Sequence, residues 1–383
     1  MNMQNPEEYP PIYLDYNATT PVDPQVLATM RPYLEEIYGN PSSGHIFGAL
    51  ARQGVEKARR QVADMLGCHP KEVIFTGGGT ESNNLAIMGA AFALRDKGDH
   101  IVTSAVEHPA VLEVCGWLKK QGFRVSVVGV DQNGLVDPHE VERALTPRTI
   151  LISVMHANNE VGIIQPIRKI ADIAHSHNIL MHTDTAQSIG KIPVDVQDLA
   201  VDLLTIAGHK IYAPKGVGGL FVRAGTPLEK ISHGAGHEFG LRPGTENVAG
   251  IAGLGEACRL VAENISDDQR RMRVMRDQLE KHLLGEFPEA KVNAADAPRL
   301  PNTSSICFPS REANKIVASS IQVAVSAGAA CHAGDVQVSH VLRAMNVPRE
   351  FAMGAIRFSV GRQTNAEEIE RAVKLFCAVI KGF

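Results

Sequence analysis

Short apolar runs rich in β-branched residues alternate with longer amphipathic segments from residue 72 onward. The short runs predict strands at 72–76, 100–104, 125–130, 150–156, 179–184, 203–207 and 218–222. Segments between them predict helices at 81–95, 110–121, 138–145 and 167–177. This alternation is typical of a mostly parallel sheet wrapped by helices, and most crossovers are long enough for right-handed βαβ units.

The pattern changes after about residue 255. Residues 267–284 are charged and repeat apolar side chains at helical spacing, and shorter strand and helix patterns follow at 303–308, 313–321, 355–360 and 367–380. We therefore predict an α/β protein of two domains. The large α/β domain spans residues 17–258 and holds a mostly parallel seven-stranded sheet, and a small α+β domain is formed by residues 1–16 and 259–383.

Composition excludes several classes of protein. The chain has 38 Lys and Arg against 42 Asp and Glu, and no basic run, which argues against a nucleic-acid partner. No apolar stretch approaches the roughly 20 residues of a membrane helix, and residues 1–11 lack the apolar core of a secretion signal. We expect a cytoplasmic protein without a membrane partner. The six cysteines never form C-x-x-C, so we predict neither disulfides nor a metal site.

Polar residues gather where the predicted strands end. They are Gly77-Gly78-Gly79-Thr80 after the first strand, then Glu107-His108, Asn158-Asn159-Glu160, Asp184 with Gln187, and His209-Lys210. Ligands of open parallel sheets bind beyond the carboxyl ends of the strands. Five strands that deliver polar groups to one edge of the sheet therefore predict a binding site there.

Three of these features indicate one cofactor when they are taken together. The glycines before Thr80 can hold a phosphate at a helix start, although a tight turn would need them too. Lys210 follows an apolar strand, where a desolvated lysine can form an imine with an aldehyde, although most lysines are simply solvated. Asp184 can hold a protonated pyridine nitrogen or cap a short helix. A phosphate site, an imine lysine and a ring carboxylate together favour pyridoxal 5'-phosphate.

Motifs along nearly the whole chain resemble those of the cysteine desulfurase and selenocysteine lyase family. This family belongs to the class V aminotransferase-like group, with pyridoxal-phosphate fold type I. The segments that carry the resemblance are Asp15-Tyr16-Asn17-Ala18-Thr19-Thr20-Pro21, Gly39-Asn40-Pro41-Ser42-Ser43, Thr80-Glu81-Ser82-Asn83-Asn84-Leu85, Asn158-Asn159-Glu160-Val161-Gly162, Gly208-His209-Lys210-Ile211-Tyr212 and Arg357-Phe358-Ser359-Val360-Gly361-Arg362.

The resemblance implies roles for individual residues. Lys210 would form the internal aldimine, Asp184 would bind the pyridine nitrogen, and His108 would stack on the ring and move protons. Gln187 and Asn159 would approach the ring oxygen. The phosphate would be held by Gly79, Thr80 and His209, and by Thr245 from the other subunit of a homodimer. On the substrate side, Asn17 and Asn159 would line the pocket, and Arg357 would clamp the carboxylate.

Cys331 is the residue that would distinguish sulfur or selenium chemistry from amino transfer. It lies in a stretch of small residues, 326–335, which predicts a flexible loop rather than a packed strand. In a desulfurase, its thiolate would attack the chalcogen of the cofactor-bound substrate and leave a persulfide and L-alanine. An acceptor protein would then take the sulfur or selenium. We interpret the other cysteines, Cys68, Cys115, Cys258, Cys307 and Cys377, as small buried hydrophobic residues.

Two departures from the family pattern matter. Ala207 stands where the family often has a serine, so one hydroxyl contact to the phosphate is missing. The flanks of Cys331, Gly328-Ala329-Ala330-Cys331-His332, resemble selenocysteine lyases more than the serine-rich desulfurases of iron–sulfur cluster assembly. The preference between L-cysteine and L-selenocysteine therefore stays open.

Two other functions also remain as alternatives. One is an aminotransferase-like enzyme of the same fold, because a fold does not determine the reaction. The other is a sulfur-relay scaffold without activity. The presence of Lys210, Asp184, His108, Arg357 and Cys331 in one chain favours the desulfurase or lyase.

Overall fold

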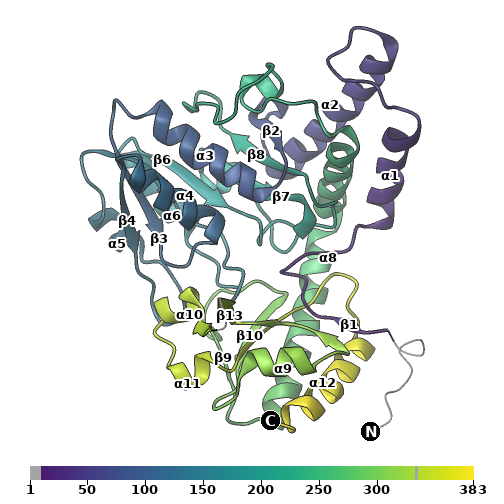
Figure 1. The fold of residues 1–383 in the computed structure, drawn as a ribbon, viewed down its shortest axis with the longest axis vertical. Coiled ribbons are helices and arrows are strands. Elements are labelled where there is room, and N and C mark those ends of the chain that lie inside the picture. The colour runs from purple at the N-terminus through teal and green to yellow at the C-terminus, as the bar shows by residue number, and fades with distance from the viewer. Residues whose placement is uncertain (1–9, 333–334) are drawn as a thin grey trace.

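A seven-stranded sheet forms the upper body of the molecule in Figure 1. The computed structural model describes residues 10–332 and 335–383. The strands of this sheet lie in the order β2-β8-β7-β6-β5-β3-β4, and only β8 runs antiparallel to its neighbours. The predicted mostly parallel sheet is therefore confirmed. Its strands are β2 (Val73–Thr76), β3 (His100–Ser104), β4 (Arg124–Val128), β5 (Thr149–Ser153), β6 (Leu180–Asp184), β7 (Leu203–Ala207) and β8 (Gly218–Val222).

Helices cover both faces of this sheet. Successive residues of a strand point to opposite faces, so Leu151 packs in one apolar cluster and Ile152 in another. The first cluster includes α3 (Gly79–Ala93) and α4 (Pro109–Lys120). The second includes α6 (Ile167–Ser176), α2 (Ile46–Leu66) and the first part of α8 (Val248–Glu286), and the short α5 (Pro138–Arg143) and α7 (Val196–Leu199) add Val141 and Val196 to it. All strands except the edge strand β4 are largely buried on both faces, so these inner strands can present functional groups only at their ends.

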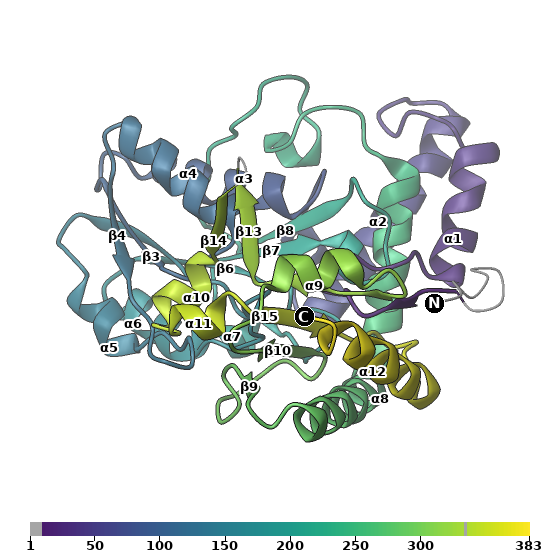
Figure 2. The same ribbon diagram turned by 60° about the horizontal axis from the view of Figure 1, so that its bottom comes forward.

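A four-stranded antiparallel sheet forms the lower body (Figures 1 and 2). Its strand order is β12-β15-β10-β9, with β12 (Ser326–Ala327), β15 (Ala355–Ser359), β10 (Thr303–Cys307) and β9 (Lys291–Val292). The helices of this region are α9 (Ala313–Ser319), α10 (His340–Ala344), α11 (Arg349–Ala352), α12 (Ala366–Ile380) and the end of α8. The N-terminal strand β1 (Ile12–Tyr13) pairs with β11 (Val323–Ala324). The N-terminal segment is thereby tied to this second region.

Helix α8 is far longer than the predicted 267–284 and begins at Val248. Its first turns are rich in small residues and are buried at nearly every position, so they show no amphipathic period. Small residues let helices approach closely: a Cβ on Gly255 would lie 2.5 Å from the Cα of Ala58 in α2. The helix passes without interruption through residue 258, where we placed the domain boundary. The division into two domains stays a prediction.

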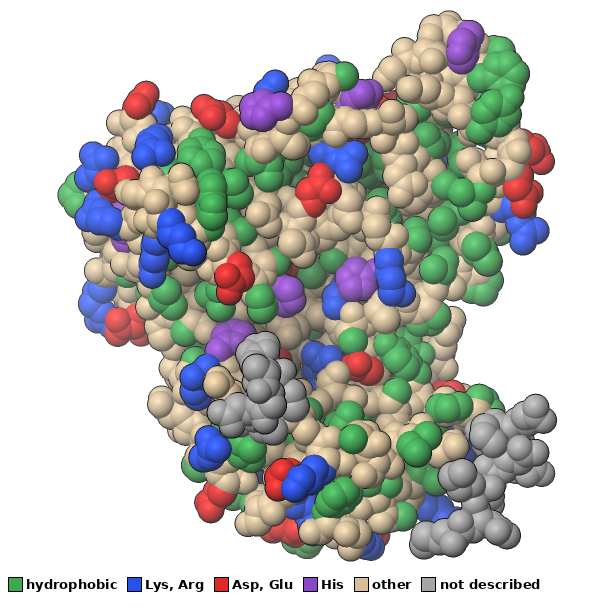
Figure 3. Space-filling view, viewed as in Figure 1, with side chains coloured by type: hydrophobic (Ala, Val, Ile, Leu, Met, Phe, Trp, Pro, Cys, Tyr) green, Lys and Arg blue, Asp and Glu red, His purple; other side chains and the backbone are tan. Residues whose placement is uncertain are grey.

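Helices α1 (Pro24–Glu35) and α2, which the strand and helix pattern did not indicate, form an arm beside α8 (Figure 1). Six large apolar side chains of this arm are 39 to 73% exposed. They are Leu27, Leu34, Tyr38, Ile46, Phe47 and Leu50, and we call them the apolar arm. Figure 3 shows hydrophobic side chains gathered there, at the upper right. Exposed apolar surfaces of this kind are typical of sites of association.

The backbone around Cys331 forms an antiparallel hairpin of β13 (Ala329–His332) and β14 (Asp335–Val338), visible in Figure 2. The prediction of a loop instead of a strand is wrong for this backbone. Small residues permit a hairpin here because the ladder uses only main-chain groups. The side chain of Cys331 lies outside the described part of the structure. Within residues 10–332 and 335–383, no helix is long and apolar enough to cross a membrane.

Candidate active site

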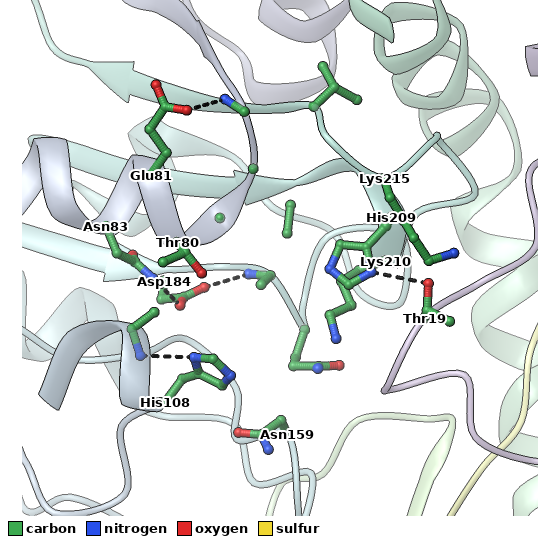
Figure 4. Close-up of a pocket in the computed structure, with 18 of the residues that line it drawn as sticks. Thr19, Thr80, Glu81, Asn83, His108, Asn159, Asp184, His209, Lys210 and Lys215 are labelled. Carbon is green, nitrogen blue, oxygen red and sulfur yellow. Dashed lines mark hydrogen bonds between the residues drawn. The ribbon is translucent and has the colours of Figure 1, made fainter. Parts of the chain in front are cut away.

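A cavity of about 860 Å³ opens at the carboxyl ends of the parallel strands. Segments distant in sequence converge on it, because each strand end delivers its polar residues to the same edge (Figure 4). Eight of the predicted site residues line this cavity: Gly79, Thr80, His108, Asn159, Asp184, Gln187, His209 and Lys210. The convergence inferred from the strand pattern is thus present in the fold.

Lys210 ends the short 3-10 helix η2 (Gly208–Lys210) that follows β7. Its Nζ donates hydrogen bonds to the backbone carbonyls of Asn17, at 2.6 Å, and Ala18, at 2.8 Å. Burial, together with the positive charge of Arg357, lowers the pKa of Lys210 from 10.5 to about 8, against the opposite effect of Asp184. A substantial fraction of this amine is therefore neutral near neutral pH and able to act as a nucleophile.

Asp184, at the end of β6, is held on both carboxylate oxygens. Its Oδ2 accepts a hydrogen bond from Asn83 Nδ2 at 2.7 Å, and its Oδ1 accepts one from the backbone N–H of Ala186 at 2.9 Å. The second contact closes a turn, and residues 185–190 do not form the short helix that the capping alternative required. The carboxylate nevertheless lines the cavity (Figure 4). Asn83 was not among the predicted site residues, although it belongs to one of the motifs.

The glycine turn leads directly into α3. Gly78 has φ +145, a conformation that other residues rarely adopt, and a Cβ on Gly218 of β8 would lie 2.7 Å from its Cα. No side chain caps the start of α3. The backbone N–H groups of its first turn can therefore serve an anion in the cavity, as the helix dipole also favours. Lys215, which we did not predict, adds a positive charge to the lining of the cavity.

Burial lowers the pKa of two histidines of the cavity and so favours their neutral form. Burial and the neighbouring Lys210 and Lys215 lower the pKa of His209 to about 4, and its Nδ1 lies 3.1 Å from Thr19 Oγ1. Burial also lowers the pKa of His108, which caps α4: its Nδ1 accepts the N–H of Ala110 at 3.1 Å. An acceptor Nδ1 requires the proton on Nε2, so His108 has one N–H to offer elsewhere.

Asn17 lies behind the cavity, is 1% exposed and forms hydrogen bonds with several neighbouring segments. Its Nδ2 donates to Thr303 Oγ1, at 2.9 Å, and to the carbonyl of Asn159, and its Oδ1 accepts from Lys191 and Asn302. Its polar groups are thus engaged within the protein. The predicted contact of Asn17 with substrate stays a prediction.

Arg357 lies on β15 of the small sheet and reaches toward the same region. It donates to Asp15 at 2.7 Å, to Ser326 at 3.0 Å and to the carbonyl of Asn159 at 3.0 Å. Its Nε is buried and, among the described residues, has no hydrogen-bond partner. Such an unsatisfied donor favours a ligand that accepts from a guanidinium, such as a carboxylate.

Asn17 and Arg357 lie next to this cavity without lining it, and two further predicted residues are not brought to it by the described structure. Thr245 is exposed, in the loop before α8, and does not line the cavity of its own chain. Cys331 is placed only through its backbone. The buried Lys191, in contrast, lies next to the site and was missed, because one lysine in a turn gives no sequence signal of burial. Within the described ranges, no cluster of His, Cys, Asp or Glu could hold a metal ion.

Fold and site together define an α/β protein with a cavity lined by Lys210 and Lys215 at the start of α3, and comparisons with known proteins identify its family. The aminotransferase class-V family model matches residues 12–372. Cysteine desulfurase IscS of Dictyoglomus turgidum is 45% identical over 372 residues, which cover 97% of this chain and 94% of that protein. Cysteine desulfurase IscS of Methanosarcina thermophila is 42% identical, with 97% and 92% covered.

Solved structures agree with this assignment. A NifS-like protein superposes with a TM-score of 0.91 at 37% identity and covers 97% of this chain and 100% of its own. A structure described as SspA in complex with cysteine gives a TM-score of 0.82 at 36% identity, with 92% and 100% covered. The chain belongs to the aminotransferase class-V family, and the predicted family resemblance is confirmed.

Proposed function

We propose that the protein is a pyridoxal-phosphate-dependent cysteine desulfurase that converts L-cysteine to L-alanine and transfers the sulfur to Cys331. The observation that carries this proposal is the half-buried Lys210, whose pKa is lowered to about 8, in one cavity with the Asp184 carboxylate and the uncapped start of α3. The names of the relatives, which are cysteine desulfurases, support the same reaction.

The residues present fit pyridoxal 5'-phosphate. The first turn of α3, with Gly79, Thr80, His209 and Lys215, would hold the phosphate, and Lys215 can compensate for the hydroxyl that Ala207 lacks. Asp184 would meet the pyridine nitrogen, and Asn159 and Gln187 would face the ring oxygen. The bound cofactor would supply an electron sink for the bonds broken at the substrate α-carbon and β-carbon.

The protein's own groups would then act as follows. Lys210, as a neutral amine, would hold the aldehyde of the cofactor and, when free, would accept a proton. His108 offers its Nε2–H beside the cavity, where it can donate and retrieve a proton. Arg357 binds the substrate carboxylate through its fork of donors. The thiolate of Cys331 would take the sulfur of the substrate and become a persulfide. This persulfide would pass the sulfur to an acceptor protein.

We also propose a homodimer. The apolar arm leaves six large side chains exposed, which a second copy of the chain would cover. Thr245 is exposed and does not line the cavity of its own chain, as is expected of a residue that contributes to the phosphate site of the other subunit.

The reaction is tested by alanine and sulfide release from L-cysteine, with dithiothreitol present to reduce the Cys331 persulfide, and with L-selenocysteine as a second substrate. The wild type should form one alanine per chalcogen released, and Lys210→Ala should lose both the visible absorption of the cofactor and turnover. Cys331→Ala should lose turnover of L-cysteine, while Cys307→Ala, at a buried position, should keep it. Alanine formation from L-cysteine that persists in Cys331→Ala would refute the sulfur-transfer step.

Selenocysteine is the second substrate to compare, because the flanks of Cys331 resemble those of selenocysteine lyases. Selenium leaves carbon more readily than sulfur does. If Cys331→Ala keeps activity with L-selenocysteine and loses it with L-cysteine, the protein is better described as a lyase.

A further inference from the structure

Lys191 is a buried lysine without an acidic partner. It follows the turn after β6 and is 4% exposed. Its Nζ donates to Gln187 Oε1 at 2.6 Å and to Asn17 Oδ1 at 3.0 Å. Among the described residues, no carboxylate forms a salt bridge with it. A buried amine that faces only amide oxygens is costly for the fold, so its position needs an explanation.

The surroundings of Lys191 favour the neutral amine. Burial lowers its pKa well below 10.5, and the positive charges of Lys210 and Arg357 lower it further. A neutral amine has two N–H groups, and two oxygens accept from it. The hydrogen-bonding capacity of the donor is therefore matched by its partners.

Lys191 determines which way the amide of Gln187 points. A glutamine amide has an acceptor oxygen and a donor nitrogen of similar shape, so a neighbour must select its orientation. The donor Lys191 draws Oε1 to itself, and the Gln187 Nε2 then donates to the Asn17 carbonyl at 3.0 Å. That same carbonyl accepts from Lys210 Nζ at 2.6 Å. The amide nitrogen of Gln187 thus lies beside the reactive amine.

We infer that Lys191 is a positioning residue, which holds the Gln187 amide so that its N–H, and not its oxygen, faces the cofactor joined to Lys210. This inference rests on the proposed function. Lys191 itself does not line the cavity, so it acts through Gln187. An N–H that faces the ring oxygen stabilises the ionised oxygen, which is the form that absorbs visible light. A reversed Gln187 amide would present its oxygen to the ionised ring oxygen, and the two oxygens would repel each other.

The test uses the holoenzyme of Lys191→Met, in which the amine is replaced by an apolar side chain of similar length. We expect the visible absorption band of bound pyridoxal phosphate to lose intensity to the near-ultraviolet band. The dissociation constant of the cofactor should rise about three- to tenfold, the loss of one hydrogen bond. Gln187→Ala should show the same spectral change, and the double variant should show no further change. Lys120→Met, at an exposed position of α4, is the matched control and should keep the wild-type spectrum.

A second variant leaves Lys191 in place. Gln187→Glu still offers an oxygen to Lys191 but has no N–H, so its band should move as in Lys191→Met. Its apo protein should melt closer to the wild type than apo Gln187→Ala does, because the contact with Lys191 is kept. Equal melting temperatures of Gln187→Glu and Gln187→Ala would overturn the inference, even if Lys191→Met does not fold.

The outcomes separate this inference from the proposed function. A wild type that binds no pyridoxal phosphate refutes the proposed function. A wild type with a visible band that Lys191→Met leaves unchanged, with or without a lower melting temperature, overturns the positioning role alone. Spectral changes that add in the double variant also overturn it, because Lys191 would then act independently of Gln187.

Discussion

The pH dependence with which the apo protein binds pyridoxal phosphate, its proposed cofactor, is a direct test of the environment of Lys210. Imine formation requires the neutral amine, and the pKa of Lys210 is lowered from 10.5 to about 8 by burial and by Arg357. At pH 8, half of this amine is neutral. An amine with pKa 10.5 would be roughly 0.3% neutral there, so the structure increases the reactive fraction roughly 150-fold.

Stopped-flow absorbance of apo protein mixed with pyridoxal phosphate measures the rate of imine formation at each pH. The rate of capture should rise with pH and level off above a midpoint near pH 8. Arg357→Gln removes the positive charge that lowers the pKa, so its midpoint should move to higher pH. Asp184→Asn removes a charge that raises the pKa, so its midpoint should move to lower pH.

The same shift has a consequence for stability. Between about pH 8 and 10.5 the unfolded chain binds a proton at Lys210 that the folded chain does not. The contribution of this residue to the free energy of unfolding should therefore rise with pH across that window.

Two results of the stopped-flow experiment would refute the reasoning about Lys210. One is a midpoint of cofactor capture near pH 10.5 in the wild type, and the other is an unchanged midpoint in Arg357→Gln.

Two further predictions concern the framework of the site. Arg59 and Glu238 form a buried ion pair with N–O distances of 2.8 Å, and Glu238 also accepts the N–H of Phe75 at 2.7 Å. Arg59→Met leaves the Glu238 carboxylate without its cation, so the free energy of unfolding in urea should fall by about 3–5 kcal/mol. A loss below 1 kcal/mol would contradict this, and Glu238→Gln should be milder because it retains acceptor and shape. In the proposed dimer, Ile46→Asp in the apolar arm should yield monomers, as measured by light scattering. The control Ile321→Asp, at a residue that is 76% exposed and outside the arm, should stay dimeric. Dimers that persist in Ile46→Asp would argue against the arm as the interface.

Much of the fold follows from local patterns. All seven strands of the large sheet were predicted within a few residues, because buried parallel strands are short, apolar and β-branched. The carboxyl ends of such strands must share an edge, so His108, Asp184 and Lys210 could be grouped without coordinates. The first half of α8 could not be recognised, since small residues buried on every side give no period.

The hairpin that carries Cys331 is a second element that local sequence patterns did not predict. Its ladder pairs Ala329 with Val338 and Cys331 with Val336 through main-chain groups. The side chains of that segment give a weak strand signal, so glycine and alanine indicated a loop. Pairing with a neighbouring segment outweighs such weak propensities.

The sequence by itself determined the family, the sheet and the kinds of reactive groups at its edge, because these depend on residue types at positions that local periodicity orders. Only the tertiary structure decided which groups are neutral and which way they point. Asn17, Lys191 and Lys210 are distant in sequence, yet they share hydrogen bonds around one carbonyl and one amide. Their protonation and orientation depend on burial and on charges brought from other segments, which exist only once the chain has folded.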